Sequence, residues 1–193
     1  MLVAAAGLKV ERIRPAYPKF RLARRVFWVE YDDMKIDGRH CRFRAVREAD
    51  LPVLAQLFPE LADFDVPEKR NPDHLWAGDF KLAEQIVRGE ADASFCEVLE
   101  EVSNGAVQGV ILVSMRGELL SGAPSAHLEA IAVHPQARGH GAGEQLLARA
   151  ESRAAELGAG SMSLHVFERN GRARGLYEKA GYDEELIRCI KWL

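Results

Sequence analysis

Residues 126–150 constrain the fold most, because they join a strand, a glycine turn and a helix without interruption. An apolar, β-branched run ends at Pro135. Arg138, Gly141 and Gly143 then follow in the spacing Arg-x-x-Gly-x-Gly, and a helical pattern begins at once. Glycines at a helix start allow a ligand close to the backbone, and the first N–H groups of the helix point outward. These donors and the helix dipole favour an anion, so the stretch predicts a turn that binds pyrophosphate.

Two common phosphate-binding motifs do not fit this turn. A P-loop requires a lysine followed by serine or threonine, and no such pair occurs in the chain. The dinucleotide fingerprint fails because Glu144 stands where the third glycine would follow Gly139 and Gly141. The segment instead resembles motif A of the GNAT acetyltransferase superfamily, whose signature is Arg/Gln-x-x-Gly-x-Gly/Ala after a strand. An ordinary glycine-rich loop is the alternative at this point.

A second segment, residues 164–182, resembles motif B of the same superfamily. It has a strand, Asn170 at the next helix start, a Leu-Tyr pair that ends at Tyr177, and Gly181 followed by an aromatic residue. Helix capping alone explains the asparagine and the glycine. It does not explain the Leu-Tyr pair at this spacing, so two motifs in the expected order identify the chain as a member of the GNAT superfamily.

Composition fits one ordinary domain. The chain has 193 residues, 48% of them hydrophobic, and a net charge of −3, which argues against nucleic acid as a partner. Cys41, Cys96 and Cys189 are too widely spaced for a metal site or a disulfide framework, and they predict buried thiols in a reducing cytoplasm. No metal is expected. No apolar run is long enough to cross a membrane, so no membrane contact is expected.

The chain divides into an N-terminal extension, residues 1–38, and an acetyltransferase domain, residues 39–193. In the extension, Val26–Tyr31 has strand composition and could form an added edge strand or a homodimer contact; the alternative is that everything before Met34 is dispensable. The domain predicts an α/β fold with a mixed sheet in the order βααβββαβαβ, as the resemblance also implies. The expected elements are strand Cys41–Val46, helices Asp50–Leu61 and 73–88, strands Ser94–Val102, Ala106–Arg116 and Ala126–Val133, a helix ending at Leu157, strand Ser161–Phe167, helix Arg172–Ala180 and strand Ile187–Leu193.

The resemblance implies acetyl-CoA as the acyl donor. Backbone groups of Ile131 and Val133 would pair with the pantetheine arm, N–H groups from Arg138 to Glu144 would hold the pyrophosphate, and Asn170 would contact the pantetheine. Asn170 could equally be a simple helix cap. The full set of expected donor-binding residues is Ile131, Ala132, Val133, Arg138, Gly139, His140, Gly141, Ala142, Gly143, Glu144, Asn170 and Ala173.

Acetyl transfer to an amine needs a base for the amine and an acid for the departing thiolate. By the resemblance, Tyr177 would be that acid. His127 and Glu129 share one face of a strand, since side chains alternate, and either could act as the base directly or through water. The strand around them is similar to that of arylalkylamine N-acetyltransferases over about nine residues. The alternative is a histidine and a glutamate that face solvent.

The acceptor is less constrained than the donor. Residues 58–76 and 117–125 are expected to form its walls, where Glu60, Asp63 and Asp65 could attract a cationic amine or simply be solvated. The sequence predicts an acetyl-CoA-dependent N-acetyltransferase acting on a primary amine of a small molecule or peptide. The alternatives are a non-catalytic acyl-CoA sensor of the same fold and an unrelated α/β phosphate-binding module.

Overall fold

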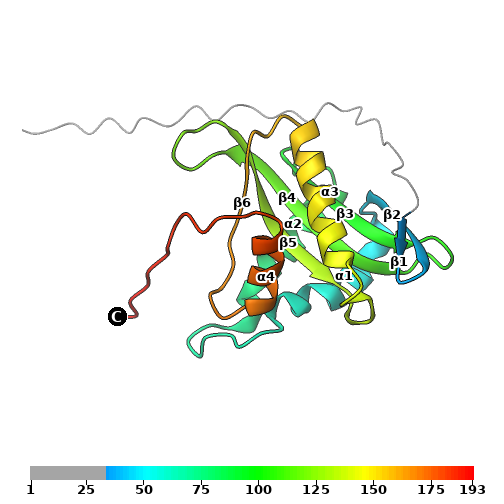
Figure 1. The fold of residues 1–193 in the computed structure, drawn as a ribbon, viewed down its shortest axis with the longest axis horizontal. Coiled ribbons are helices and arrows are strands. Elements are labelled where there is room, and N and C mark those ends of the chain that lie inside the picture. The colour runs from blue at the N-terminus through cyan, green and yellow to red at the C-terminus, as the bar shows by residue number, and fades with distance from the viewer. Residues whose placement is uncertain (1–33) are drawn as a thin grey trace, which may run out of the picture.

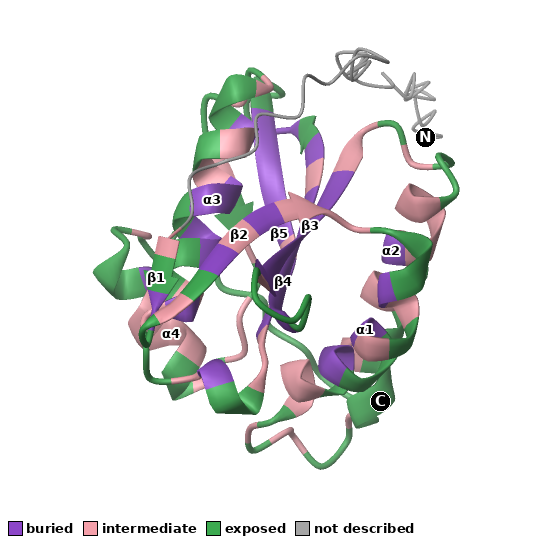
Figure 2. Cartoon of the chain, turned by 90° about the vertical axis from the view of Figure 1, so that its right-hand side faces the viewer, coloured by how far each residue is buried: buried purple, intermediate pink, exposed green. Residues whose placement is uncertain are grey.

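The computed structural model describes residues 34–193, which form a six-stranded sheet with helices on both faces (Figure 1). The strands lie across the sheet in chain order and pair antiparallel, except for β5 and β6, which are parallel. Helices α1 and α2 cover one face, and α3 and α4 cover the other (Figure 2). The elements are β1 (Met34–Ile36), β2 (Arg39–Ala45), α1 (Leu51–Leu57), α2 (Ala77–Val87), β3 (Ser94–Glu101), β4 (Val107–Gly117), β5 (Pro124–Val133), α3 (Ala142–Glu156), β6 (Met162–Leu164) and α4 (Gly171–Lys179).

The mixed α/β fold predicted from the sequence is confirmed, but the order of its elements is ββααβββαβα. Strand β1 was not predicted, and it falls inside the stretch assigned to the extension. It pairs with β2 through a tight turn in which Asp37 and Gly38 have φ values of 49° and 76°. Asp-Gly in a two-residue hairpin turn is a recognised signal, which the shortness of the strand concealed.

The predicted final strand over 187–193 is wrong. Residues 183–193 have no regular secondary structure, and Ile187 is 91% exposed. A β-branched, apolar segment forms a strand only when a neighbouring strand pairs with it. In the described part of the chain, the three-residue β6 pairs only with β5. Cys189 lies in this exposed segment, so the expectation of three buried thiols holds only for the other two cysteines.

The two helices before β3 are shorter than predicted. The helix expected over 50–61 continues beyond α1 only as a 3-10 helix, η2 (Phe58–Ala62), which has a proline at its first turn. The helix expected over 73–88 is a short 3-10 helix, η3 (Pro72–Leu75), followed by α2. The strand predicted at 26–31, with its suggested dimer contact, lies outside the described residues.

Helix α3 packs directly on the sheet because Gly109 of β4 leaves room for it. A Cβ at this position would lie 2.6 Å from Leu146 Cδ1 and 2.9 Å from Ala132 O. Leu146 is fully buried. The absence of a side chain at Gly109 therefore allows α3 to pack close to β4 and to β5, the strand that leads into the glycine turn.

A buried ion pair joins the same helix to the sheet. Glu97 of β3 accepts hydrogen bonds from Arg149 of α3, from Nε at 2.6 Å and from Nη2 at 3.0 Å. The side chains are only 2% and 8% exposed. The Arg149 guanidinium also lies 5.9 Å from the centre of the Phe43 ring. Breaking such a pair leaves a buried charge, which is far more costly than losing a surface pair.

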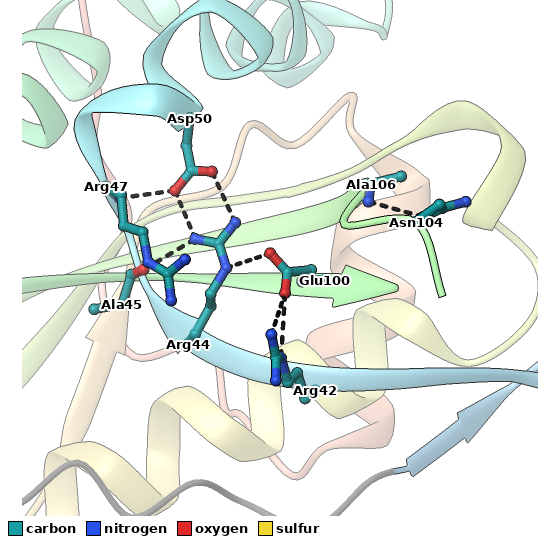
Figure 3. A network of polar contacts seen from close by, with 8 residues as sticks. All are labelled: Arg42, Arg44, Ala45, Arg47, Asp50, Glu100, Asn104 and Ala106. Carbon is teal, nitrogen blue, oxygen red and sulfur yellow. Dashed lines mark hydrogen bonds and ion pairs between the residues drawn. The ribbon is translucent and has the colours of Figure 1, made fainter. Parts of the chain in front are cut away.

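A second polar network fixes the start of α1 (Figure 3). Arg44 donates to both carboxylate oxygens of Asp50, at 2.6 and 2.8 Å, and to Glu100 at 2.5 Å. The backbone N–H of Arg47 also donates to Asp50. Burial alone would raise the pKa of Asp50, but the hydrogen bonds from Arg44 and Arg47 outweigh it and lower that pKa. The network thus orients α1 and the segment that follows it relative to the sheet.

Candidate active site

Strands β5 and β6 separate after a short contact. Their registered pairs run only from Ala126 opposite Met162 to Leu128 opposite Leu164. The pairing of β5 with β4 contains a bulge at Glu129. Leu128 and Ala130, on either side of it, pair with consecutive residues of β4, so Glu129 has no partner in the register. Within residues 34–193 no strand pairs with the outer edge of β5 beyond this bulge. This stretch is therefore an open sheet edge to which an extended ligand could pair, although the Val133 carbonyl already accepts a hydrogen bond from Arg138 Nε at 3.2 Å.

The glycine turn lies at the end of this open edge. A 3-10 helix, η4 (Pro135–Ala137), leads from β5 into the turn, where Gly139 and Gly141 have φ values of 78° and 82°. Gly141 is the N-cap of α3, and Gln145 N–H donates to its carbonyl at 3.1 Å. The N–H groups of residues 141–144 have no helical partner by construction, which is the geometry that an anion site requires, and binding of pyrophosphate at this turn stays a prediction.

Ten of the twelve predicted donor-binding residues lie on this edge and turn, and two of the ten are buried. Half-buried or exposed, and so accessible to a ligand, are Ile131, Val133, Arg138, Gly139, His140, Gly141, Gly143 and Glu144. Ala132 and Ala142 are 3% and 1% exposed, and their side chains pack in the core. A Cβ at Gly143 would lie 3.6 Å from Leu176, which shows how closely α3 approaches α4.

Asn170 caps α4. Its side-chain oxygen accepts a hydrogen bond from the N–H of Ala173 at 3.1 Å, and both residues are half-buried. The capping alternative considered for Asn170 is therefore present in the structure. A contact with the pantetheine arm stays a prediction, since the capping bond uses only one of the polar groups of the amide.

Tyr177 lies on α4, about two turns from that cap. It is 8% exposed, and burial raises its pKa to about 12. Its ring lies 5.9 Å from the ring of Tyr182, centre to centre. The phenol is therefore fully protonated at neutral pH, which is the state that a proton donor requires.

His127 and Glu129 lie side by side, with His127 Nε2 4.0 Å from Glu129 Oε2. His127 is only 3% exposed, and its Nδ1 lies 2.9 Å from Ser163 Oγ on β6. Burial, together with the charges of Arg116 and His165, lowers the pKa of His127 to about 3. This histidine is therefore neutral and held in place, while Glu129, with 25% of its side chain exposed, remains accessible.

Asp79 is a candidate that the sequence analysis missed. It lies half-buried in the first turn of α2, where an aspartate is usually explained by the helix dipole. Burial and the nearby charge of Glu129 raise its pKa to about 7. A carboxyl group that titrates near neutral pH is suited to proton transfer, and such groups concentrate at functional sites. No group of three His, Cys, Asp or Glu side chains in residues 34–193 is arranged to hold a metal ion.

The acidic residues expected to attract an amine are engaged with arginines instead. Arg138, at the start of the glycine turn, contacts Glu60 and Asp63. Asp65 pairs with Arg169 at 2.9 Å. The side chains of Asp63 and Asp65 are 53% and 76% exposed, so these carboxylates are solvated as well as paired with arginines. No local pattern in the sequence indicates these long-range contacts.

Comparison with known proteins agrees with this arrangement. The model of the acetyltransferase (GNAT) family matches residues 54–182, more than half of the chain. The chain is 28% identical over 142 residues to the uncharacterized N-acetyltransferase YhfO of Bacillus subtilis (strain 168). The matched region covers 74% of this chain and 89% of that protein.

Solved structures share the fold at low sequence identity. A protein described as a transcriptional regulator from Bacillus halodurans C-125 matches with a TM-score of 0.61 and 22% identity, over 80% of this chain and 100% of that chain. The aminoglycoside N-acetyltransferase AAC(6')-Iy in complex with CoA matches with a TM-score of 0.61 and 21% identity, over 83% of this chain and 98% of that chain.

Proposed function

Because the chain belongs to the acetyltransferase (GNAT) family and is an N-acetyltransferase with acetyl-CoA as its donor, we propose that it acetylates a primary amine of a small molecule or peptide. The observation that carries this proposal is the open edge of β5, which leads directly into the glycine turn at the start of α3. An extended arm and its terminal pyrophosphate require these two features in this order.

In this proposal the donor is held mainly by backbone groups. The last residues of β5, Ile131 and Val133, pair with the pantetheine arm, and the N–H groups between Arg138 and Glu144 hold the pyrophosphate. Hydrogen bonds to a charged group contribute about 1.5–3 kcal/mol each, so a few of them are enough for micromolar affinity. Asn170 keeps its capping bond and offers its remaining polar group to the arm.

Proton transfer is assigned to the groups around the bulge in β5 and on α4. Glu129, with Asp79 beside it, takes the proton that the ammonium group must lose before its nitrogen attacks the thioester carbon. His127 is neutral and lies 4.0 Å from the Glu129 carboxylate, a distance that leaves any proton relay between them to a bridging water. As the carbon–sulfur bond breaks, Tyr177 donates its phenolic proton to the sulfur of the leaving thiolate, and the phenolate takes up the second proton that the nitrogen releases as the amide forms.

The test is release of free CoA against a panel of primary amines, followed by Tyr177→Phe. Turnover with at least one amine is expected, and Tyr177→Phe should lower kcat by about 10²–10⁴-fold with little change in acetyl-CoA affinity. Tyr182→Phe is the matched control, since that ring packs beside Tyr177 and should leave kcat unchanged. Saturable acetyl-CoA binding without turnover on any amine would favour the acyl-CoA sensor. Equal kcat in Tyr177→Phe and wild type would remove this residue from the mechanism.

A further inference from the structure

Residues 60–65, called the strap here, contact two segments that diverge after the pairing of β5 with β6 ends. These segments, the end of β5 with the glycine turn and the start of α4, are called the two walls. On one side, Arg138 donates from Nη1 to Asp63 Oδ2 at 2.8 Å, and its Nη2 contacts Glu60. The same Arg138 also donates from Nε to Val133 O, the last carbonyl of β5, at 3.2 Å. The strap is therefore attached at the point where the open strand edge meets the glycine turn.

The strap also contacts the opposite wall. Arg172, in the first turn of α4, donates to Asp63 Oδ2 at 3.3 Å. Asp65 pairs with Arg169, and the rings of Phe64 and Phe167 lie 5.4 Å apart. One carboxylate oxygen of Asp63 thus accepts from two guanidinium groups that belong to the two separate walls.

This arrangement is the one that an oxygen of a phosphate group would adopt. Guanidinium groups bind carboxylates and phosphates with the same fork of donors, so the two anions compete for them. The hydrogen bonds from Arg138 and then Arg172 lower the pKa of Asp63, which therefore stays ionised at neutral pH. Glu60 and Asp63 are 31% and 53% exposed, so water and ions can replace these contacts at modest cost.

We propose that the strap is an autoinhibitory contact that the phosphates of the donor displace. The pyrophosphate binds Arg138 and Arg172 in place of Asp63 and Glu60, and the strap moves away from the two walls. The strap belongs to the segment expected to form the acceptor wall, so the acceptor gains access only after the donor has bound. This inference rests on the proposed function, because it requires the pyrophosphate to bind at residues 138–144.

The first experiment compares the dissociation constants of CoA and of S-acetylpantetheine, which lacks the phosphates. Asp63→Asn should bind CoA about 3- to 10-fold more tightly than wild type, in line with the loss of two competing surface pairs, and should bind S-acetylpantetheine unchanged. Glu68→Gln removes the same charge from an exposed position nearby and should change neither constant. Unchanged CoA affinity in Asp63→Asn, or an equal gain in Glu68→Gln, would overturn the proposal.

The second experiment measures hydrogen exchange of the strap in the wild-type protein. Saturating CoA should speed exchange in residues 60–65, whereas S-acetylpantetheine should not. Slower exchange in the strap with CoA would overturn the displacement. Gly141→Val distinguishes failure of the donor site from failure of the strap proposal. If Gly141→Val leaves CoA affinity unchanged, the proposed donor site is wrong. If it weakens CoA binding while Asp63→Asn has no effect, only the strap proposal fails.

Discussion

The ion pair between Glu97 and Arg149 should dominate the stability of the layer between α3 and the sheet. Glu97→Gln keeps the shape of the side chain but removes the carboxylate charge that the buried Arg149 guanidinium contacts. Both side chains are less than a tenth exposed and share two hydrogen bonds, so we expect the free energy of unfolding to fall by about 3 kcal/mol, the lower end for a broken buried pair. A domain of this kind has about 5–15 kcal/mol in total, so the loss is large.

Urea unfolding followed by far-ultraviolet circular dichroism measures this loss from the shift in midpoint at constant slope. Glu84→Gln is the matched control, because its pair with Arg88 is 3.6 Å long and solvent-exposed and should contribute less than about 1 kcal/mol. Replacing both Glu97 and Arg149 by leucine and methionine should recover most of the stability, since neither charge of this pair is then buried. Equal losses in Glu97→Gln and Glu84→Gln would refute the claim that burial sets the magnitude.

Four further changes follow from the structure. Gly109→Ala should lower the free energy of unfolding by about 1–3 kcal/mol, because its Cβ would lie 2.6 Å from a leucine carbon of α3, whereas Gly175→Ala, in open helical space, should raise it slightly; urea unfolding measures both. Gly141→Val should weaken CoA binding by tenfold or more in calorimetry, because φ of 82° and close approach of a ligand both favour glycine. Asp50→Asn should be less stable than wild type at pH 7. The lowered pKa of Asp50 means that its contribution is present above about pH 4 and is lost as the pH falls through the folded-state pKa, so the difference in unfolding midpoint should vanish in acid. A chain that starts at Met34 should keep its kcat in the CoA-release assay, because every proposed site residue lies after it, and a folded but inactive truncation would contradict this.

The sequence predicted those elements whose signals are local. The glycine turn, the capping residue of α4 and the hairpin between β3 and β4 each depend on residues within a few positions of one another. The final strand failed because strand formation depends on a partner, which no local pattern reveals. The helices predicted over 50–61 and 73–88 were too long for a similar reason. The apolar periodicity continues through η2, which contains Pro59, and through η3, but the backbone of both segments forms 3-10 turns and not α-helix.

The bulge at Glu129 shows the same limit inside the site. Strict alternation along β5 would keep every second residue on one face, but Leu128 and Ile131 pack in the same core cluster although three positions separate them. The bulge changes the alternation where β5 parts from β6, so it alters which side chains face each side of the sheet at the start of the open edge. Sequence periodicity identifies Glu129 as a candidate base, but the pairing register is needed to explain why its side chain is accessible while that of His127 is buried.

The regulation proposed for the site depends on contacts between distant segments, which are the features least visible in the sequence. Arg138 was predicted as a donor-binding residue and Asp63 as an acceptor-wall residue, and 75 positions separate them. Their ion pair joins the two halves of the predicted site before any ligand is present. Taken separately, each residue has an ordinary explanation. Arg138 is a basic residue near the expected phosphate site, and Asp63 is an acidic residue on a loop. Only the fold brings them together, and it makes one carboxylate a competitor of the phosphates that the arginine is expected to bind.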